Sequence, residues 1–537
     1  MRTVTRTSAV TSQARFTTPA TIMQQQNTLH VVDLAIIVVY LIGLFLVGLF
    51  FSRRQTSEDT YYLGNRKTPW FLAGVSVLAT LLSTLTYLSI PGEMIRYGIG
   101  YFSSLVAFVL IIPTVNWVIV PVLMRLPVTS VYEYLERRFG LAARMVGAAV
   151  FVLMRFVWMG LIIYTASNAV REMTGWNITW IILLVGIGTT LYTTAGGMQA
   201  VLWSDFAQFV LLLGGAVVIP TYIAFQTQAG PADWWEIFST AKRTTVPVFT
   251  TDLTVRITMV GMILEVYVWN LCTHGADQVA AQRYLSTPSA GAARRSVWVF
   301  SLCNIVLMLL LMTCGLALFY YRFTQAGVPI EQFQSAIGPT ADHVLPQFIA
   351  GQLPRGVSGL LLAALLAAAM SSLSSGINSV GAVVVTDFVG RLRITPPGQS
   401  NLALAKWLAV AAGVAGIAFA LLVVWMTAWV DWNLVEMIGR VNHLFVAPLG
   451  ALFFAGILFR CVGTTAALLG FCCGVLTSFL VSFSQPLFGM EKGISFMWIM
   501  PASLLVSLAV SYATGFVFRP PSEEQVTAMQ LRSLTDP

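Results

Sequence analysis

Apolar stretches long enough to cross a bilayer recur along almost the whole chain. They lie, to within a few residues, at 31–51, 70–95, 102–124, 143–171, 178–195, 200–226, 254–282, 297–321, 356–389, 403–428, 433–459, 463–484 and 496–517. About twenty apolar residues in a helix span the hydrocarbon core, and a helix satisfies its own backbone hydrogen bonds in lipid. Because 57% of the 537 residues are hydrophobic and only 10% are charged, we expect an all-α polytopic membrane protein with about thirteen transmembrane helices.

The polar segments are short, so they predict one transmembrane domain rather than several soluble ones. This domain is expected to cover residues 29–519, with a short external helix near residues 341–351. Residues 1–28 are rich in Thr, Ser and Gln, which predicts a disordered tail; Met23 is an alternative start of translation. Residues 520–537 form a polar tail at the other end.

Arginine and lysine residues gather in alternate loops. The basic residues on one side of the predicted membrane are Arg53, Arg54, Arg66, Lys67, Arg125, Arg137, Arg138, Arg283, Arg294, Arg295, Arg391, Arg393, Lys406, Arg460 and Arg519. The positive-inside rule places this side in the cytoplasm of a cell (plasma) inner membrane, with the N-terminus outside and the C-terminus inside. The formal charge of +8 therefore reports topology, and we expect neither a nucleic-acid partner nor an obligatory protein partner.

A run of small polar residues occupies the middle of the apolar stretch at 356–389. The residues that share one helical face are Ala364, Ala368, Ser371, Ser375, Asn378 and Ala382, with Ser372, Ser374 and Ser379 beside it. Lipid offers hydroxyls no partner, so this face must meet other helices, a water-filled cavity or a bound ion. From this stretch alone, the small polar face is compatible with close helix packing and with ligand binding.

The span at 70–95 has the composition of a broken helix. Its polar positions are Ser76, Thr80, Ser83, Thr84, Thr86 and Ser89, and Pro91-Gly92 follow them. Unwound backbone exposes carbonyl oxygens, and carbonyls together with neutral hydroxyls form a site for a small hard cation such as sodium. The alternative is a proline kink that neighbouring helices satisfy.

Among the acidic residues that lie inside or at the end of apolar spans, Asp205 and Asp277 also stand in distinctive sequence surroundings. Asp205 follows Gly196-Gly197 by about two helical turns, and an ionisable group within a span is a functional candidate by default. A structural salt bridge or a helix N-terminal position is the alternative for Asp205. For Asp277, close to the cytoplasmic end of its span, we expect pairing with an arginine and a structural or gating role.

Two arginines lie deep in predicted spans. Arg155 could hold a substrate carboxylate through two hydrogen bonds, or serve a structural ion pair. Arg440 has Glu436 at i, i−4 spacing, which favours a structural pair there.

No constellation typical of an enzyme emerges from the sequence. The histidines His30, His274, His343 and His443 lie in different segments, and the six cysteines lack metal-ligand spacing. We therefore expect a protein that is not an enzyme.

Three motifs carry a resemblance to a known family. They are Gly196-Gly197-Met198-Gln199-Ala200-Val201-Leu202-Trp203-Ser204-Asp205, then Asp277-Gln278 with Gln282-Arg283, and Ala368 through Ser379. Together with Ser83-Thr84-Leu85-Thr86-Tyr87 and Pro91-Gly92, their order resembles the sodium/solute symporter family, whose members carry sugars, proline, sialic acid, iodide or monocarboxylates. The resemblance extends over roughly residues 31–460.

The resemblance implies a LeuT-like fold of two inverted five-helix repeats. These are expected at about 70–226 and 254–460, with one helix before them and two after. Such repeats hold ion and substrate near the midplane, beside the first helix of each repeat, and rock against each other to give alternating access.

By position, the resemblance also implies ion-binding residues, with Na+ as the coupling ion. The first sodium site falls on the carbonyls of Ala79, Leu82 and Ala368 and the hydroxyls of Ser371 and Ser372. A second sodium site, present in some members, falls on Asp205, Ser374 and Ser375.

The implied substrate pocket draws on Ser83, Thr86, Arg155, Asn270 and Thr273, and on the span at 433–459. Sugar is disfavoured, because Thr273 stands where the sugar transporters have a stacking tyrosine and Leu85-Thr86 replace their acidic-amide pair. We therefore expect sodium-driven import of a small carboxylate or amino acid by alternating access. Proton coupling through Asp205, a neutral solute such as an inositol or a nucleoside, and a sensor or channel-like role are the alternatives.

Overall fold

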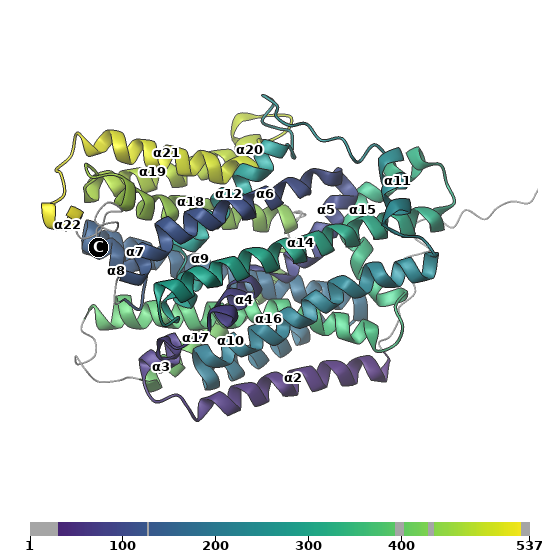
Figure 1. Ribbon diagram of the computed structural model, residues 1–537, viewed down its shortest axis with the longest axis horizontal. Coiled ribbons are helices and arrows are strands. Elements are labelled where there is room, and N and C mark those ends of the chain that lie inside the picture. The colour runs from purple at the N-terminus through teal and green to yellow at the C-terminus, as the bar shows by residue number, and fades with distance from the viewer. Residues whose placement is uncertain (1–29, 126–127, 393–401, 428–433, 528–537) are drawn as a thin grey trace, which may run out of the picture.

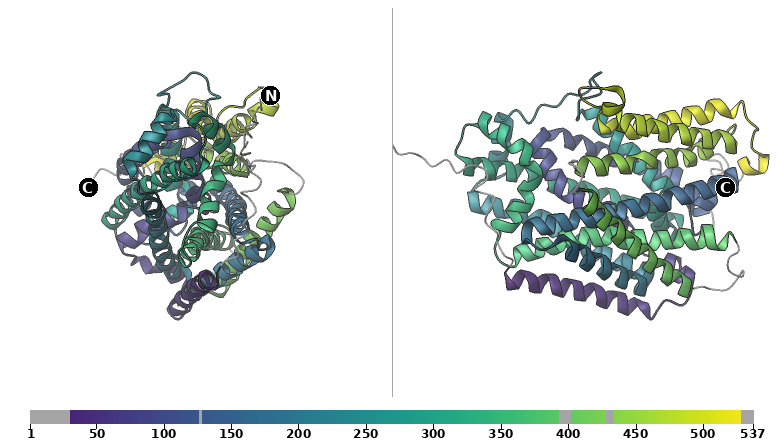
Figure 2. Two further views of the ribbon diagram at one scale, coloured as in Figure 1. Left: turned by 90° about the vertical axis from the view of Figure 1, so that its right-hand side faces the viewer. Right: turned by 180° about the vertical axis from the view of Figure 1, so that it is seen from behind.

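The computed structural model describes residues 30–125, 128–392, 402–427 and 434–527, and every regular element among them is a helix. The helices run along the long axis of the molecule (Figure 1) and pack side by side when seen end-on, with α2 at the outer edge (Figure 2). We call the end that carries α3 and α8 the basic end; α11 and α15 lie at the opposite end (Figure 1). The predicted tail 1–28 and residues 528–537 lie outside the described residues.

The first half of the described bundle contains three long helices, α2, α9 and α10, and several short ones. Its elements are α2 (Val31–Ser52), α3 (Glu58–Leu63), η1 (Gly64–Arg66), α4 (Trp70–Leu81), α5 (Thr84–Tyr97), η2 (Gly98–Ser103), α6 (Ser104–Thr114), η3 (Val115–Ile119), α7 (Val120–Arg125), α8 (Tyr132–Phe139), α9 (Leu141–Thr174), α10 (Ile178–Thr227) and α11 (Pro231–Thr240).

The second half continues in the same way. Its elements are α12 (Met259–Ala276), α13 (Gln278–Leu285), α14 (Ala290–Ala326), α15 (Ile330–Gly351), α16 (Val357–Val383), η4 (Val384–Gly390), α17 (Leu402–Thr427), α18 (Leu434–Leu458), α19 (Thr464–Ser482), α20 (Ser484–Phe488), η5 (Phe496–Trp498), α21 (Ile499–Gly515) and α22 (Glu523–Thr527).

Each predicted span coincides with helix among the described residues, although several consist of two consecutive elements. Nine of the described helical stretches are long and apolar enough to cross a membrane on their own, and α4 and the last part of α18 are shorter apolar helices. The external helix predicted at 341–351 is longer than expected, since α15 begins at Ile330.

The predicted break in the span at 70–95 lies between α4 and α5. Leu82 and Ser83 take extended backbone angles, and the Ser83 hydroxyl then caps α5 by accepting a hydrogen bond from the Thr86 amide at 3.3 Å. The last carbonyls of α4 therefore have no amide partner within their own helix. Pro91 lies inside α5 rather than at the break.

A second break divides the first long helix of the other repeat. α12 ends at Ala276, Asp277 is extended, and α13 begins at Gln278 with the Asp277 carboxylate accepting a hydrogen bond from the Val279 amide at 2.9 Å. Both breaks interrupt the first span of a predicted repeat, as two inverted repeats require. The repeat limits at 70–226 and 254–460 stay predictions.

The 50-residue element α10 is a hairpin of two antiparallel legs that match the spans predicted at 178–195 and 200–226. The reversal lies at Gly197, where φ is 57° and ψ is −152°. Tyr192 interacts with Ser204 and Gln208 across this point. In a straight helix Tyr192 and Gln208 would be about 24 Å apart.

A methyl group at Gly197 is expected to destabilise the hairpin. An ideal Cβ there would lie 2.7 Å from the Tyr61 Cδ2 atom, at a backbone conformation that only glycine adopts easily. Gly197→Ala should therefore lower the free energy of unfolding by more than about 1 kcal/mol, measured as a fall in Tm. Gly214→Ala is the matched control, because nothing lies within 4 Å of its Cβ position; an equal effect in both variants would refute this reason.

Helix α16 lies at the centre of the bundle. It is almost wholly buried. It packs against the hairpin α10 and against α9, α17, α2 and α4. Its small residues allow these helices to approach closely, as the alternative of helix packing predicted. The hydroxyl-bearing segment of α16 is thereby placed beside the break between α4 and α5.

Candidate functional site

The hydroxyl of Ser372 on α16 faces the carbonyls at the end of α4. It donates to the Thr80 carbonyl at 3.0 Å and lies 3.5 Å from the Leu82 carbonyl. The hydroxyl of Thr84, the first residue of α5, donates to the Leu365 carbonyl on α16 at 2.8 Å. The break and the serine cluster, predicted separately, therefore form one oxygen-rich junction, with Ala79 and Ala368 fully buried beside it.

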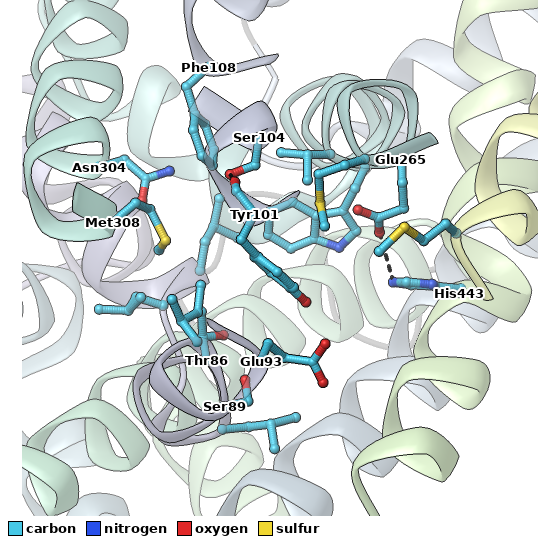
Figure 3. A pocket seen from close by; sticks show the side chains of 18 of the residues that line it. Thr86, Ser89, Glu93, Tyr101, Ser104, Phe108, Glu265, Asn304, Met308 and His443 are labelled. Atoms are coloured by element: carbon cyan, nitrogen blue, oxygen red, sulfur yellow. Dashed lines mark hydrogen bonds and ion pairs between the residues drawn. The ribbon is translucent and has the colours of Figure 1, made fainter. Parts of the chain in front are cut away.

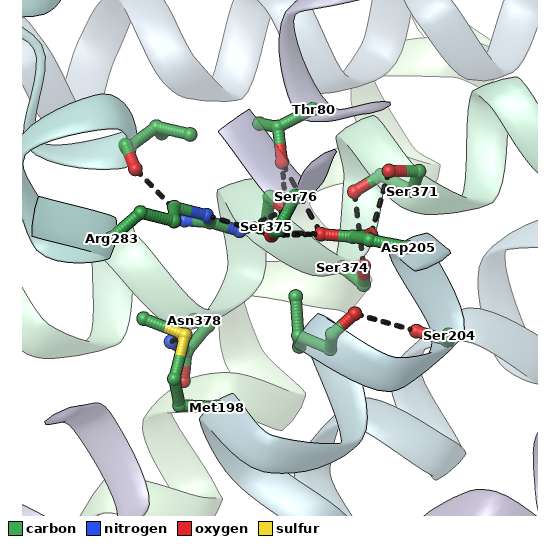
Figure 4. A network of polar contacts seen from close by, with 12 residues as sticks. Ser76, Thr80, Met198, Ser204, Asp205, Arg283, Ser371, Ser374, Ser375 and Asn378 are labelled. Atoms are coloured by element: carbon green, nitrogen blue, oxygen red, sulfur yellow. Dashed lines mark hydrogen bonds and ion pairs between the residues drawn. The ribbon is translucent and has the colours of Figure 1, made fainter. Parts of the chain in front are cut away.

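The carboxylate of Asp205 on α10 lies at the centre of a second, connected set of polar groups (Figure 4). It accepts hydrogen bonds from Ser76 at 2.5 Å, from Ser371 at 2.7 Å and from Thr80 at 3.4 Å. Asp205 is completely buried. Buried carboxylates are tolerated when several donors and a counter-charge satisfy them.

The counter-charge is Arg283 on α13, whose guanidinium lies 3.8 Å from the Asp205 carboxylate. The guanidinium also donates to Ser76 at 3.2 Å, to the Val279 carbonyl at 2.9 Å and to Ser375. Both charged side chains are fully buried. Asp205 and Arg283 thus form an electrically neutral pair that joins the first repeat to the second.

The structure arranges the serines differently from the expected grouping. Ser371, assigned to the first sodium site, donates to Asp205, whereas Ser374 donates to the Ser371 carbonyl at 2.9 Å. Ser375 lies 2.7 Å from the Thr80 hydroxyl and contacts Arg283 instead of Asp205. Ser371 and Ser375 share a face because they are four residues apart.

A second ion pair joins α9 to the break between α12 and α13. The Arg155 guanidinium donates to the Asp277 carboxylate. The Arg155 Nε atom is buried and has no hydrogen-bond partner in the part of the chain that the structure describes, so one donor of this guanidinium stays available. Asp277 thus pairs with an arginine, as the sequence led us to expect. Whether Arg155 also contacts a substrate carboxylate stays a prediction.

A cavity of about 250 Å³ lies between the break in α4 and α5 and the end of the bundle opposite the basic end (Figure 3). Thr86 from the predicted pocket lines it. Other polar groups that line it were not identified from the sequence as a site: Ser89, Glu93, Tyr101, Ser104, Arg256, Glu265, Asn304 and His443. We call this space the outer cavity.

A smaller cavity lies deeper in the bundle and contains Arg155, Thr273 and Asp277. Three side chains line both this inner cavity and the outer cavity: Leu81, Trp158 and Trp269. These bulky apolar side chains lie where the two spaces adjoin, and we call them the partition. A solute that contacts Arg155 from the outer cavity must therefore pass this partition.

The other predicted substrate residues lie near these cavities. Ser83 is buried, and its hydroxyl lies 3.3 Å from that of Thr86. Asn270 is buried and donates to the Val266 carbonyl at 2.8 Å, while its side-chain oxygen has no partner. Arg440 donates to the Ser482 carbonyl; its predicted partner Glu436 has a side chain outside the described residues.

Comparison with protein families identifies relatives over most of the chain. The model of the sodium:solute symporter family matches residues 61–474. The sodium/sialic acid symporter SiaT of Proteus mirabilis (strain HI4320) is 30% identical over 448 residues, which cover 82% of this chain and 87% of that protein. The sodium-coupled monocarboxylate transporter 1 of Mus musculus is 28% identical over 452 residues, covering 82% of this chain and 71% of that protein.

Solved structures share the architecture. A Na+-coupled sialic acid symporter in a substrate-bound, outward-open state superposes with a TM-score of 0.82 at 27% identity, covering 92% of this chain and 99% of that one. Mhp1, a nucleobase-cation-symport-1 family transporter, matches with a TM-score of 0.54 at 11% identity, covering 88% of this chain and 99% of that one. At this identity the match shows a shared fold and no more. The expected LeuT-like all-helical fold and the expectation that the chain is not an enzyme are confirmed. The chain belongs to the sodium:solute symporter family and is a sodium-coupled solute symporter.

Proposed function

We propose that this symporter uses an inward sodium gradient to import a small carboxylate or amino acid by alternating access. The observation that carries the proposal is the spare donor of Arg155. The guanidinium is already paired with Asp277, yet its Nε atom is buried without a partner at the edge of the inner cavity. A solute carboxylate would satisfy that donor, and an unsatisfied buried donor is costly.

The coupling ion is proposed to bind where Ser372 meets the end of α4. The carbonyls of Ala79, Leu82 and Ala368 and the hydroxyls of Ser371 and Ser372 supply neutral oxygen ligands of the kind that hard cations prefer. Ser372 already bridges to the Thr80 and Leu82 carbonyls. A cation there would replace this hydroxyl's hydrogen bonds with direct coordination.

Charge balance supports coupling between ion and solute. Arg155 and Asp277 cancel each other, so a bound carboxylate adds one negative charge to this part of the bundle. One sodium ion at the end of α4 would restore neutrality. The ion would also lie close to the solute, because Leu81 and Leu82 at the end of α4 line the outer cavity. In a low-dielectric interior each ligand therefore raises the affinity of the other. We propose that sodium orders the break and raises solute affinity in the outward-open state.

A second sodium ion is proposed at Asp205, with Ser374 and Ser375 as further ligands. In this structure Arg283 neutralises Asp205, so a second ion requires the guanidinium to move away or the site to carry net positive charge. Proton coupling through Asp205 is the alternative to sodium. We further propose the topology in which the basic end faces the cytoplasm, the N-terminus lies outside and the C-terminus inside.

The solute class is tested by uptake into proteoliposomes under a fixed sodium gradient. Each carboxylate in the panel is compared with its own primary amide, which keeps shape and removes charge, and polyols and sugars are included. We expect sodium-driven uptake of carboxylates and at least tenfold less of the matched amides, since a hydrogen bond to a charged group contributes about 1.5–3 kcal/mol. Equal uptake of acid and amide, or uptake of polyols alone, would contradict the carboxylate proposal.

Removing the Ser372 hydroxyl should weaken the first sodium site. Ser372→Ala deletes one oxygen ligand while leaving the small-residue packing of α16 intact. We expect the sodium concentration for half-maximal uptake to rise several-fold, with maximal uptake retained at saturating sodium. Ser358→Ala is the control, because Ser358 lies on the same helix and its hydroxyl donates to the Ile349 carbonyl away from the break. An unchanged sodium dependence in Ser372→Ala would assign the hydroxyl to packing.

A further inference from the structure

Four buried polar atoms of residues that line the outer cavity have no hydrogen-bond partner among the described residues: three can accept a hydrogen bond, and the fourth, Arg256 Nε, is a donor. The Glu93 Oε2, Asn304 Oδ1 and His443 Nδ1 atoms are buried and have no partner among the described residues. The Glu265 carboxylate is nine-tenths buried, and His443 at 3.6 Å is its ion-pair contact in the described structure. Figure 3 shows the carboxylates of Glu93 and Glu265 directed into the same part of the cavity. A ligand that complements this lining must bring donors.

The charges in the outer cavity do not cancel. Arg256 lies 2.8 Å from the Glu93 carboxylate, and its guanidinium lies between the rings of Tyr97 and Phe496, each 4.9 Å away. This cation pairs with Glu93, while its Nε atom has no hydrogen-bond partner among the described residues. Among the described residues, the counter-charge of Glu265 is a histidine, which is charged only when protonated. An isolated carboxylate in such surroundings favours a cationic ligand.

The position of Glu265 restricts the geometry of that ligand. Glu265, Trp269, Thr273 and Asp277 recur every four residues and share one face of the α12 region. Glu265 and Trp269 line the outer cavity, whereas Thr273 lines the inner cavity with Arg155. The helical rise between Glu265 and Thr273 is about 12 Å. The two charged groups of an α-amino acid are too close together to reach both positions.

We propose that Glu265 is a specificity-determining residue that binds a protonated amine at the end of the solute remote from its carboxylate. The inference rests on the proposed function, in which Arg155 holds the carboxylate. The solute class is then an ω-amino carboxylate, whose amine and carboxylate are separated by several bonds. Its ammonium group satisfies Glu265, and its carboxylate reaches past Trp269 toward Arg155 as the partition opens.

The test compares three solutes that share a five-carbon acid: 5-aminopentanoate, 2-aminopentanoate and pentanoate. Sodium-driven uptake is measured in proteoliposomes for the wild-type chain and for Glu265→Gln. The wild type should take up 5-aminopentanoate at least tenfold more efficiently than either of the others. Glu265→Gln should remove most of this preference while leaving uptake of pentanoate and the half-saturating sodium concentration unchanged.

Two further variants separate recognition from folding. His443→Gln removes the other member of the pair and keeps the Glu265 charge, so the amine preference should persist. Glu265→Asp keeps the charge at shorter reach and should restore part of the preference. Equal loss for all three solutes in Glu265→Gln and His443→Gln would make the pair structural and overturn the proposal.

Other outcomes are equally decisive. A wild-type chain without preference for 5-aminopentanoate, or a Glu265→Gln variant that alters only the sodium dependence, would overturn the role of Glu265 while leaving carboxylate transport intact. If the sodium gradient drives uptake of none of the three acids but drives uptake of their amides or of polyols, the proposed function itself fails.

Discussion

Asp205→Asn is expected to abolish sodium-driven uptake and to lower the stability of the protein. The substitution keeps the size of the side chain and one of its two acceptor oxygens, which receive hydrogen bonds from Ser76 and Ser371, but removes the charge that neutralises Arg283. Both members of this pair are fully buried, and removing one partner of a buried pair costs about 3–5 kcal/mol because the other charge is left uncompensated. The measurements are Tm in detergent and uptake in proteoliposomes.

A second substitution separates the stability effect from the ion-binding effect. In Asp205→Asn/Arg283→Gln no unpaired charge remains, so Tm should recover most of the loss, while sodium-dependent uptake should stay impaired if Asp205 is an ion ligand. Asp59→Asn on the exposed first turn of α3 is the control and should change stability by less than about 0.5 kcal/mol. Full recovery of uptake in the double variant would limit Asp205 to a structural role, and a wild-type Tm in the single variant would refute the buried pair.

Arg155→Gln is expected to reduce uptake of a carboxylate solute by about 10- to 100-fold or more. The guanidinium contributes its charge and its free Nε donor to the inner cavity, and charged hydrogen bonds contribute about 1.5–3 kcal/mol each. The substitution also leaves Asp277 without its partner. Uptake efficiency at saturating sodium is the measurement.

The competing explanation is that Arg155 only neutralises Asp277. Asp277→Asn removes that charge and keeps the N-terminal cap of α13, because an asparagine oxygen can also accept from the Val279 amide. If Arg155 holds the solute, Arg155→Gln/Asp277→Asn should stay inactive towards carboxylates. Restored carboxylate uptake in this double variant would show that the arginine serves the ion pair alone.

The fold could be predicted from the sequence because a bilayer imposes simple rules on length and polarity. Helix positions follow from apolar stretches of about twenty residues, and the break near Leu82 follows from the polar composition of its span. The Gly196-Gly197 motif separated two predicted spans, and the structure explains why: Gly197 adopts a backbone conformation that permits the reversal.

The candidate site could be predicted only in part. Sequence motifs placed Ser372 beside the α4 carbonyls, but the partner of Asp205 could not be deduced, because Arg283 lies on another repeat and its pairing depends on tertiary packing. The helical spacing already placed Ser371 and Ser375 on one face, whereas the grouping of Ser374 with Ser375 came from the resemblance to the family. Glu265 was not singled out, although it lies inside the span predicted at 254–282 and an ionisable residue in a span is a functional candidate. No motif marks it, and its surroundings are known only from the cavity that α5, α12 and α18 help to form.

The most direct measurement is accumulation of a radiolabelled carboxylate in proteoliposomes that contain the wild-type chain, under either of two imposed gradients. One set carries an inward sodium gradient at equal pH, and the other carries choline in place of sodium with an inward proton gradient. Sodium-coupled symport predicts accumulation above equilibrium only in the first set, together with a higher half-saturating sodium concentration in Ser372→Ala. Equal accumulation with choline and a proton gradient would contradict sodium coupling and favour proton coupling through Asp205.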